Sequence, residues 1–105
     1  MDDDLLAFFL QDKPARILLV MAESGKTYPA DVSKALAATY SHIVRVIQKL
    51  EIYGLIKSTK EGRTKYIELT DAGQEVASAL KSLNEALTRV QERLADSKRP
   101  AEKLE

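Results

Sequence analysis

One predicted helix carries a face of side chains that could form hydrogen bonds and ion pairs with an anionic polymer. The helix spans about residues 40–53, and the side away from its apolar residues presents Ser41, His42, Arg45, Gln48 and Lys49. Arginine can bond bidentately to guanine, glutamine to adenine, and serine to several bases. Val44 lies at the border of this face and could contact a thymine methyl group. A solvated helix face is usually polar as well, so the helix alone leaves both interpretations open.

A second group of cationic side chains surrounds the expected β-hairpin that follows. A nine-residue span around the two-residue connection Glu61-Gly62 holds Lys57, Lys60, Arg63 and Lys65. Lysine-rich strands can simply protect a sheet edge from aggregation. An arginine directly after the tip glycine is better explained by contact with a minor groove, where narrow sequences concentrate negative potential. The full candidate DNA-binding set is Thr39, Ser41, His42, Val44, Arg45, Gln48, Lys49, Lys60, Arg63, Thr64 and Lys65.

The composition excludes several other kinds of chemistry. The 105 residues fit one domain of ordinary size, and 45% of them are hydrophobic. There is no cysteine, and there are one histidine and four glycines, so thiolate metal sites, histidine clusters and phosphate-binding glycine loops have no material. No nucleophile–base set is visible. We therefore expect no enzyme, no cofactor and no metal site.

The net charge of zero hides a segregated distribution. Residues 1–25 hold two bases against five acids, a net charge of −3. Residues 26–66 hold eight bases against three acids, a net charge of +5, and residues 67–105 hold six against eight, a net charge of −2. This segregation predicts an anionic partner for the middle of the chain.

The elements that position these groups follow from periodicity, caps and breakers. We expect helices at about 4–11, 14–23, 29–38, 40–53 and 71–97, with strands at 55–60 and 63–69. Lys13-Pro14 should separate the first two helices, and Arg99-Pro100 should end the last. The segment 26–28 is a linker or a short strand. A two-stranded sheet is not stable alone, so it must pack on the helices in an α+β, mainly α, domain.

Apolar spacing and capping residues fix the expected core. The expected helix at 29–38 should bury Val32, Ala35 and Leu36, and the expected helix at 40–53 should bury Tyr40, Ile43, Ile47 and Leu50. Thr39 or Ser41 can cap the helix at 40–53, and Thr70 can cap the helix at 71–97. Gly25 and Gly54 are placed to end the helices that precede them.

Residues 29–75 resemble a winged helix-turn-helix domain. The resemblance is carried by the runs Asp31–Leu36, Tyr40–Glu51 and Tyr53–Ile56. The continuation Glu61–Gly73 resembles the wing and following helix start of MarR-like regulators. ArsR-like regulators are similar in size and layout, but their thiol metal site has no counterpart in this chain.

The resemblance implies a dimeric transcription factor. Its helix at about 40–53 reads the major groove, and its wing, residues 57–66, contacts the backbone or minor groove. It divides the chain into an N-terminal helix (1–12), a winged helix-turn-helix core (14–70) and a dimerisation helix (71–98), which form one domain (1–98), and a flexible tail (99–105). Two positions depart from the pattern. Val44 stands where such helices are often polar, and Pro29 stands where a Ser or Thr cap is common.

The long C-terminal helix carries a heptad stripe of apolar residues. They are Val76, Leu80, Leu83, Leu87, Val90 and Leu94, at alternating steps of four and three. A helix that projects beyond a small core needs a partner for such a stripe. The N-terminal residues Leu5, Leu6, Phe8 and Phe9 could cover part of it within one chain or from a second subunit. We favour a homodimer, because two-fold dimers are the commonest assemblies.

No segment approaches the roughly 18 apolar residues of a membrane span, and acids precede the apolar run Leu5–Leu10 where a signal peptide would be basic. We therefore expect a cytoplasmic protein that binds double-stranded DNA and no membrane, with no residue cluster that identifies a small-molecule effector. Two alternatives stay open: a winged-helix protein–protein interaction module and a weakly specific architectural DNA binder.

Overall fold

The computed structural model describes residues 11–104, with side chains described as far as residue 96. The elements in order are α2 (Asp12–Ser24), α3 (Pro29–Leu36), α4 (Tyr40–Ile52), β1 (Ile56–Glu61), β2 (Thr64–Leu69) and α5 (Asp71–Leu104). The expected N-terminal helix and its residues Leu5, Leu6, Phe8 and Phe9 lie outside the described residues. The α+β, mainly α, fold class is confirmed.

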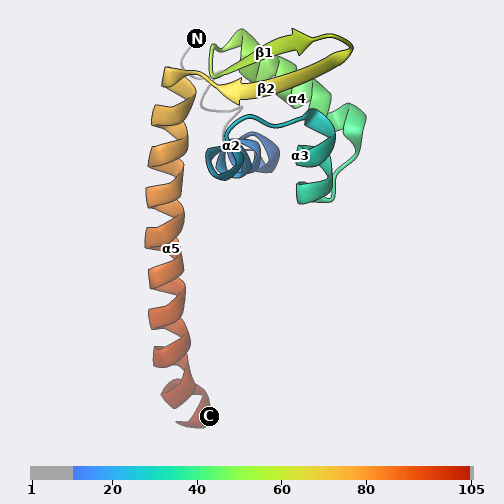
Figure 1. The fold of residues 1–105 in the computed structure, drawn as a ribbon. Helices are drawn as coiled ribbons and strands as arrows, with labels where there is room; N and C mark the ends of the chain where they lie inside the picture. The colour runs from blue at the N-terminus through green and yellow to red at the C-terminus, as the bar shows by residue number, and fades with distance from the viewer. Residues whose placement is uncertain (1–10, 105) are drawn as a thin grey trace.

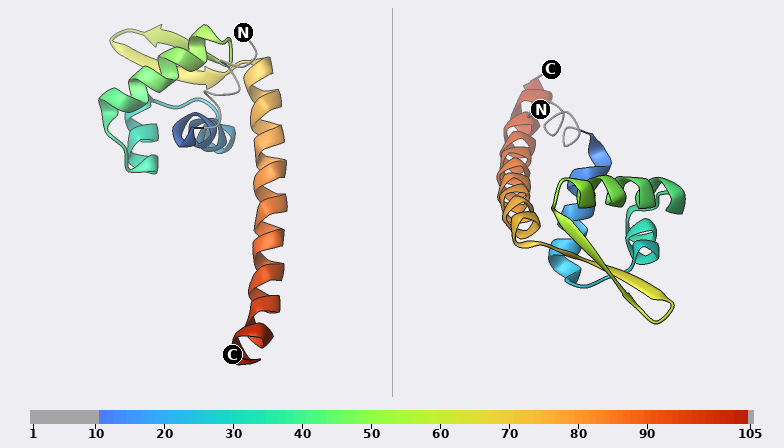
Figure 2. Two further views of the ribbon diagram at one scale, coloured as in Figure 1. Left: turned by 180° about the vertical axis from the view of Figure 1, so that it is seen from behind. Right: turned by 90° about the horizontal axis from the view of Figure 1, so that it is seen from above.

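The elements from α2 to β2 form the head of the molecule (Figure 1). Helix α2 lies at its centre, with α5 on one side and α3 on the other (Figures 1 and 2). It contacts α3, α4, α5 and β2. Its buried residues Ile17, Leu18 and Met21 join the fully buried Val32 of α3 and Ile43 of α4 in one core. Because each helix buries one face there, the opposite face of α4 is fixed outward.

The hairpin is attached to the head by a short third segment. Strands β1 and β2 pair antiparallel from Ile56 opposite Leu69 to Glu61 opposite Thr64. The Thr27 N–H donates to the Ile67 carbonyl at 3.0 Å, and the Ile67 N–H donates to the Thr27 carbonyl at 2.8 Å. The expected short strand at residues 26–28 is therefore present as a single bridge.

The turn of the hairpin lies one residue later than predicted. Glu61 pairs with Thr64, so the connection is Gly62-Arg63 and not Glu61-Gly62. Gly62 has a φ of 61°, which a glycine adopts without strain. Arg63 is consequently at the tip itself.

Two residues predicted to be in the core are exposed. Tyr40 is 56% exposed, and Val46, which is 9% exposed, joins Ile43, Ile47 and Leu50 instead. Tyr40 begins α4, so its side chain lies one turn before the stretch that packs on α2. Ala35 is exposed too, and α3 buries Val32.

Tight connections join the helix pair and the last strand to α5. Ala37 takes a left-handed conformation with φ 51° between α3 and α4. Thr39 precedes α4 without a side-chain capping bond, so neither Thr39 nor Ser41 caps it as predicted. The Thr70 hydroxyl does cap α5, accepting the Gly73 N–H at 3.0 Å. Gly25 and Gly54, both with positive φ, follow α2 and α4 as expected.

Helix α5 extends far beyond the head and gives the molecule extents of 63 × 31 × 21 Å (Figure 1). It continues to Leu104, so the predicted helix end at Arg99-Pro100 is wrong, while the flexibility of the tail stays a prediction. A proline removes one helical N–H donor and often kinks a helix, but it need not end it. Within the described residues, no helix is long and apolar enough to cross a membrane.

Candidate nucleic-acid interface

The outward face of α4 carries the polar residues predicted for it. Ile43, Ile47 and Leu50 are buried beneath this helix and fix its rotation. The opposite side is exposed at Ser41, His42, Arg45, Gln48 and Lys49, while Val44 is half-buried. These five groups can therefore meet a partner without repacking of the core.

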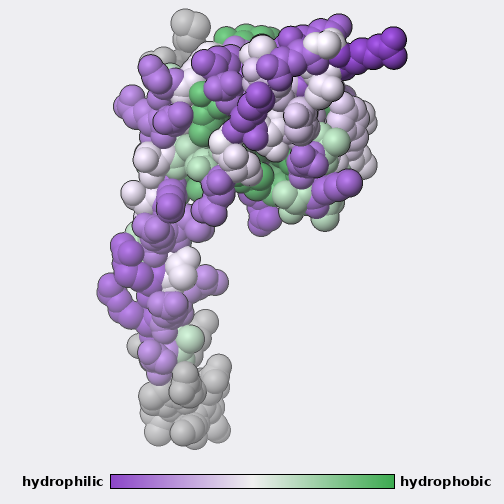
Figure 3. Space-filling model, in the orientation of Figure 1, coloured by the Kyte–Doolittle hydropathy of each residue, from purple (hydrophilic) through white to green (hydrophobic). Residues whose placement is uncertain are grey.

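The hairpin presents the second predicted group. Lys60, Arg63, Thr64 and Lys65 are all exposed, and Figure 3 shows a hydrophilic surface over the hairpin. Lys60 stands directly opposite Lys65 across the strands. Like charges in this arrangement are destabilising, so folding alone gives no reason for the pair. An anionic partner would offset the repulsion.

Ion pairing divides the eight bases of residues 26–66 into two classes. The Lys26 Nζ lies 3.5 Å from Glu61 Oε1, and the Lys57 Nζ lies 3.9 Å from Glu68 Oε1. The other six form no ion pair with any residue that the structure describes; they are Lys34, Arg45, Lys49, Lys60, Arg63 and Lys65. Most of the segment's positive charge is therefore available to a ligand.

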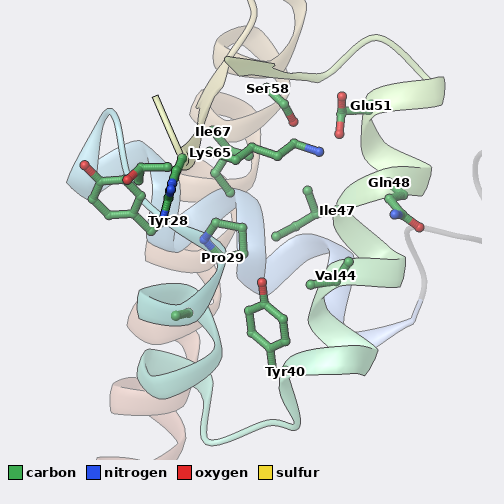
Figure 4. Close-up of a pocket in the computed structure, with 13 residues that line it drawn as sticks. Tyr28, Pro29, Tyr40, Val44, Ile47, Gln48, Glu51, Ser58, Lys65 and Ile67 are labelled. Carbon is green, nitrogen blue, oxygen red and sulfur yellow. The ribbon is translucent and has the colours of Figure 1, made fainter. Parts of the chain in front are cut away.

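A groove of about 480 Å³ separates α4 from the hairpin. From α4, Val44 and Ile47 point into it, and from β2 the ammonium end of Lys65 points across toward α4 (Figure 4). Gln48 of α4 also lines it. The Ser58 hydroxyl oxygen is buried there without a hydrogen-bond partner. The groove thus has an apolar floor with polar groups on both walls.

Sequence reasoning missed two aromatic residues of this groove. Tyr28 is 41% exposed and Tyr40 is 56% exposed, and both line it. The spacing held a signal for Tyr40, because it stands four residues before Val44 and eight before Gln48, on the same side of α4. Of the predicted site residues, Val44, Gln48, Arg63, Thr64 and Lys65 line the groove. The remaining ones, Thr39, Ser41, His42, Arg45, Lys49 and Lys60, are exposed outside it.

The described residues contain no group of three or more His, Asp or Glu side chains that could hold a metal ion. Their geometry suits an extended anionic partner that contacts α4 and the hairpin together. The cationic and hydrogen-bonding groups come from two different elements. Only their packing on α2 and on the segment at Thr27 brings them to the same part of the molecule.

The family model of the DUF6293 C-terminal winged helix domain matches residues 6–81. The chain belongs to this winged-helix family. An uncharacterized protein of Archaeoglobus fulgidus is 30% identical over 87 residues, which are 79% of this chain and 92% of the relative. A segment of the phenylalanine–tRNA ligase alpha subunit of Methanopyrus kandleri is 38% identical over 77 residues, which are 73% of this chain but only 14% of that subunit.

Solved structures of transcriptional regulators share the fold of this winged-helix domain. A MarR family transcriptional regulator from Silicibacter pomeroyi superposes with a TM-score of 0.74 at 24% identity, covering 90% of this chain and 69% of its own. Lactococcus lactis ZitR gives 0.76 at 22% identity over 83% of this chain, which spans 61% of that structure. The predicted MarR-like winged-helix resemblance is confirmed at the level of the fold.

Proposed function

We propose that this winged-helix protein is a dimeric, sequence-specific DNA-binding transcriptional regulator. Helix α4 enters the major groove, and the hairpin contacts the adjacent backbone or minor groove. The observation that carries the proposal is the set of six unpaired bases on α3, α4 and the hairpin, beside an exposed hydrogen-bonding face on α4. The likeness to a solved MarR family transcriptional regulator supports it.

The dimer rests on the exposed stripe of α5. Val76 and Leu80 are partly buried against the core of the same chain. The next four residues of the heptad pattern are Leu83, Leu87, Val90 and Leu94, which are 55%, 55%, 47% and 49% exposed. A second copy of α5 would bury this stripe and present two α4 helices to two half-sites of one duplex.

Fluorescence anisotropy with a labelled random duplex tests DNA binding. Affinity should fall linearly on a log–log plot against salt, with a slope of about −0.9 for each phosphate neutralised. The same sequence as an A-form RNA duplex should bind more weakly, because its deep, narrow major groove does not admit α4. Salt-independent association, or no binding to DNA, would contradict the proposal.

A second candidate function is that of a winged-helix module within a larger assembly. The similarity to a short segment of a tRNA ligase subunit favours it, because that relative carries the matching sequence as 14% of a longer chain. A variant with both Arg45→Ala and Arg63→Ala separates the two functions. Loss of duplex binding supports the regulator, whereas unchanged partner binding in this variant supports the module.

A further inference from the structure

Lys26 is one of the eight bases of residues 26–66, but its side chain contacts other residues of the protein at the hairpin. It lies between α2 and α3, yet its ammonium reaches both strands of the hairpin. The Nζ atom is 3.5 Å from Glu61 Oε1 at the end of β1 and 3.7 Å from the centroid of the Tyr66 ring on β2. A single side chain therefore bridges the head to the two strands near the hairpin tip.

The neighbouring residue attaches the same part of the hairpin through its backbone. Thr27 is 8% exposed and exchanges two hydrogen bonds with Ile67, the residue after Tyr66. Lys26 and Thr27 thus hold successive residues of β2. A two-stranded hairpin has little stability of its own, so such attachments determine its orientation against α4.

The electrostatics of Lys26 agree with a charge that is used within the protein. Partial desolvation disfavours its ammonium form, but the attraction of Glu61 and of Tyr66 outweighs this and raises the pKa of Lys26 above its ordinary value. Residues 60–65 at the hairpin tip contain three bases, Lys60, Arg63 and Lys65, and one acid, Glu61. The ion pair with Lys26 explains why an acid stands at position 61 among these bases.

We propose that Lys26 is a positioning residue for the wing: it holds the hairpin at the orientation in which Lys60, Arg63 and Lys65 contact nucleic acid, and itself contacts no phosphate. The inference rests on the proposed function for its role in binding. The attachment itself is a property of the free protein. Two measurements therefore separate a failure of the attachment from a failure of DNA binding.

Amide hydrogen exchange of the free protein tests the attachment. Lys26→Gln should accelerate exchange at the Thr27 and Ile67 amides by about two- to fivefold, and Glu61→Gln should do so by less, because it removes the ion pair but leaves the contact of Lys26 with Tyr66. The double variant should add little to Lys26→Gln, because both changes remove the same ion pair. Lys60→Gln is the matched control, because it removes an unpaired charge from the same hairpin, relieves the repulsion from Lys65 and should not accelerate exchange at these two amides. Unaltered exchange in Lys26→Gln would overturn the proposal.

The salt dependence of binding to a random DNA duplex tests the role in recognition. Lys26→Gln should weaken binding by about two- to fivefold with an unchanged slope, whereas Lys60→Gln should reduce the slope by about 0.9. Lys26→Arg should restore binding, because a guanidinium can also pair with Glu61 and stack on Tyr66. An equal loss of slope in Lys26→Gln would make Lys26 a phosphate contact and overturn its positioning role. No binding by the unaltered chain would instead overturn the proposed function, and the exchange result would stand apart from it.

Discussion

Single cationic side chains in this protein differ in whether an acid lies within ion-pair distance of them. Lys57 lies opposite Glu68 in the sheet and is paired with it at 3.9 Å. Lys65 stands opposite Lys60 and has no ion-pair partner among the described residues. Exposed ion pairs contribute little to stability, but they do reduce the charge that a side chain offers to a ligand.

Lys65→Gln should weaken binding to all DNA sequences alike and reduce the salt slope by about 0.9, because one phosphate contact is lost. Lys57→Gln is the control in the same hairpin and should leave the slope unchanged. Titrations of one random duplex at several salt concentrations measure both variants. Equal slope changes would show that ion pairing does not separate the two lysines.

The outward residues of α4 could be predicted from the sequence, because the spacing of Ile43, Ile47 and Leu50 determines which side of the helix is buried. The pairing of Lys26 with Glu61 could not. These residues are far apart in the chain, and their contact depends on the bridge between Thr27 and Ile67. A count of charges by segment therefore assigned Lys26 to the anionic partner along with the other bases.

At the scale of elements, the junction between the hairpin and α5 determines where the long helix begins. The Thr70 hydroxyl accepts the Gly73 N–H at 3.0 Å and donates to the Gly54 carbonyl at 2.7 Å. A side chain at Gly73 would collide with the Leu55 carbonyl, so the backbones approach closely there. One hydroxyl thus connects the start of α5 to the end of the α4 region.

Thr70→Val should lower the free energy of unfolding by about 1–2 kcal/mol, because it removes the cap of α5 and leaves two backbone groups without their partner. Thr88→Val is the matched control. Its hydroxyl donates only to the Asn84 carbonyl on the exposed surface of α5, and the change should stay within about 0.5 kcal/mol. Urea unfolding followed by circular dichroism measures both. A loss in Thr70→Val no larger than the control would contradict the role of the cap.

Element types and order follow from periodicity and caps, but their ends depend on packing and pairing. The cap at Thr70 was predictable because a polar residue precedes a periodic apolar run. The predicted turn was one residue too early, because cross-strand pairs such as Ile56 with Leu69 set the register and place the turn at Gly62-Arg63. The exposure of Tyr40 depends on where α4 leaves the core, which its own periodicity does not reveal.

For the whole molecule, the main question is what covers the far part of α5. Figure 1 shows this helix leaving the head after its first turns, beyond the reach of α2. The first two stripe residues pack in the same chain, and the four that follow are about half exposed. The heptad spacing predicted the stripe, but only the structure shows where its contact with the other described elements ends.

Leu87→Glu should convert a dimer into a monomer, because burying the introduced charge in both copies weakens association by about a hundredfold or more. Leu87 is 55% exposed in the single chain, so the head should fold normally. Thr88→Glu introduces the same charge at the next position, away from the stripe, and should leave the dimer intact. Sedimentation equilibrium measures the masses. A monomeric unaltered chain, or one whose mass does not change in Leu87→Glu, would contradict α5 dimerisation.

Selection of bound duplexes from a random pool tests most directly whether α4 reads base sequence. The unaltered protein should enrich two half-sites about 10 base pairs apart, as expected for a two-fold dimer. Arg45→Ala should lose the preference at one position in each half-site, whereas Arg89→Ala, which removes an exposed arginine of α5, should keep the full pattern. An enriched site that Arg45→Ala retains unchanged, or no enrichment by the unaltered protein, would contradict base-specific recognition by α4.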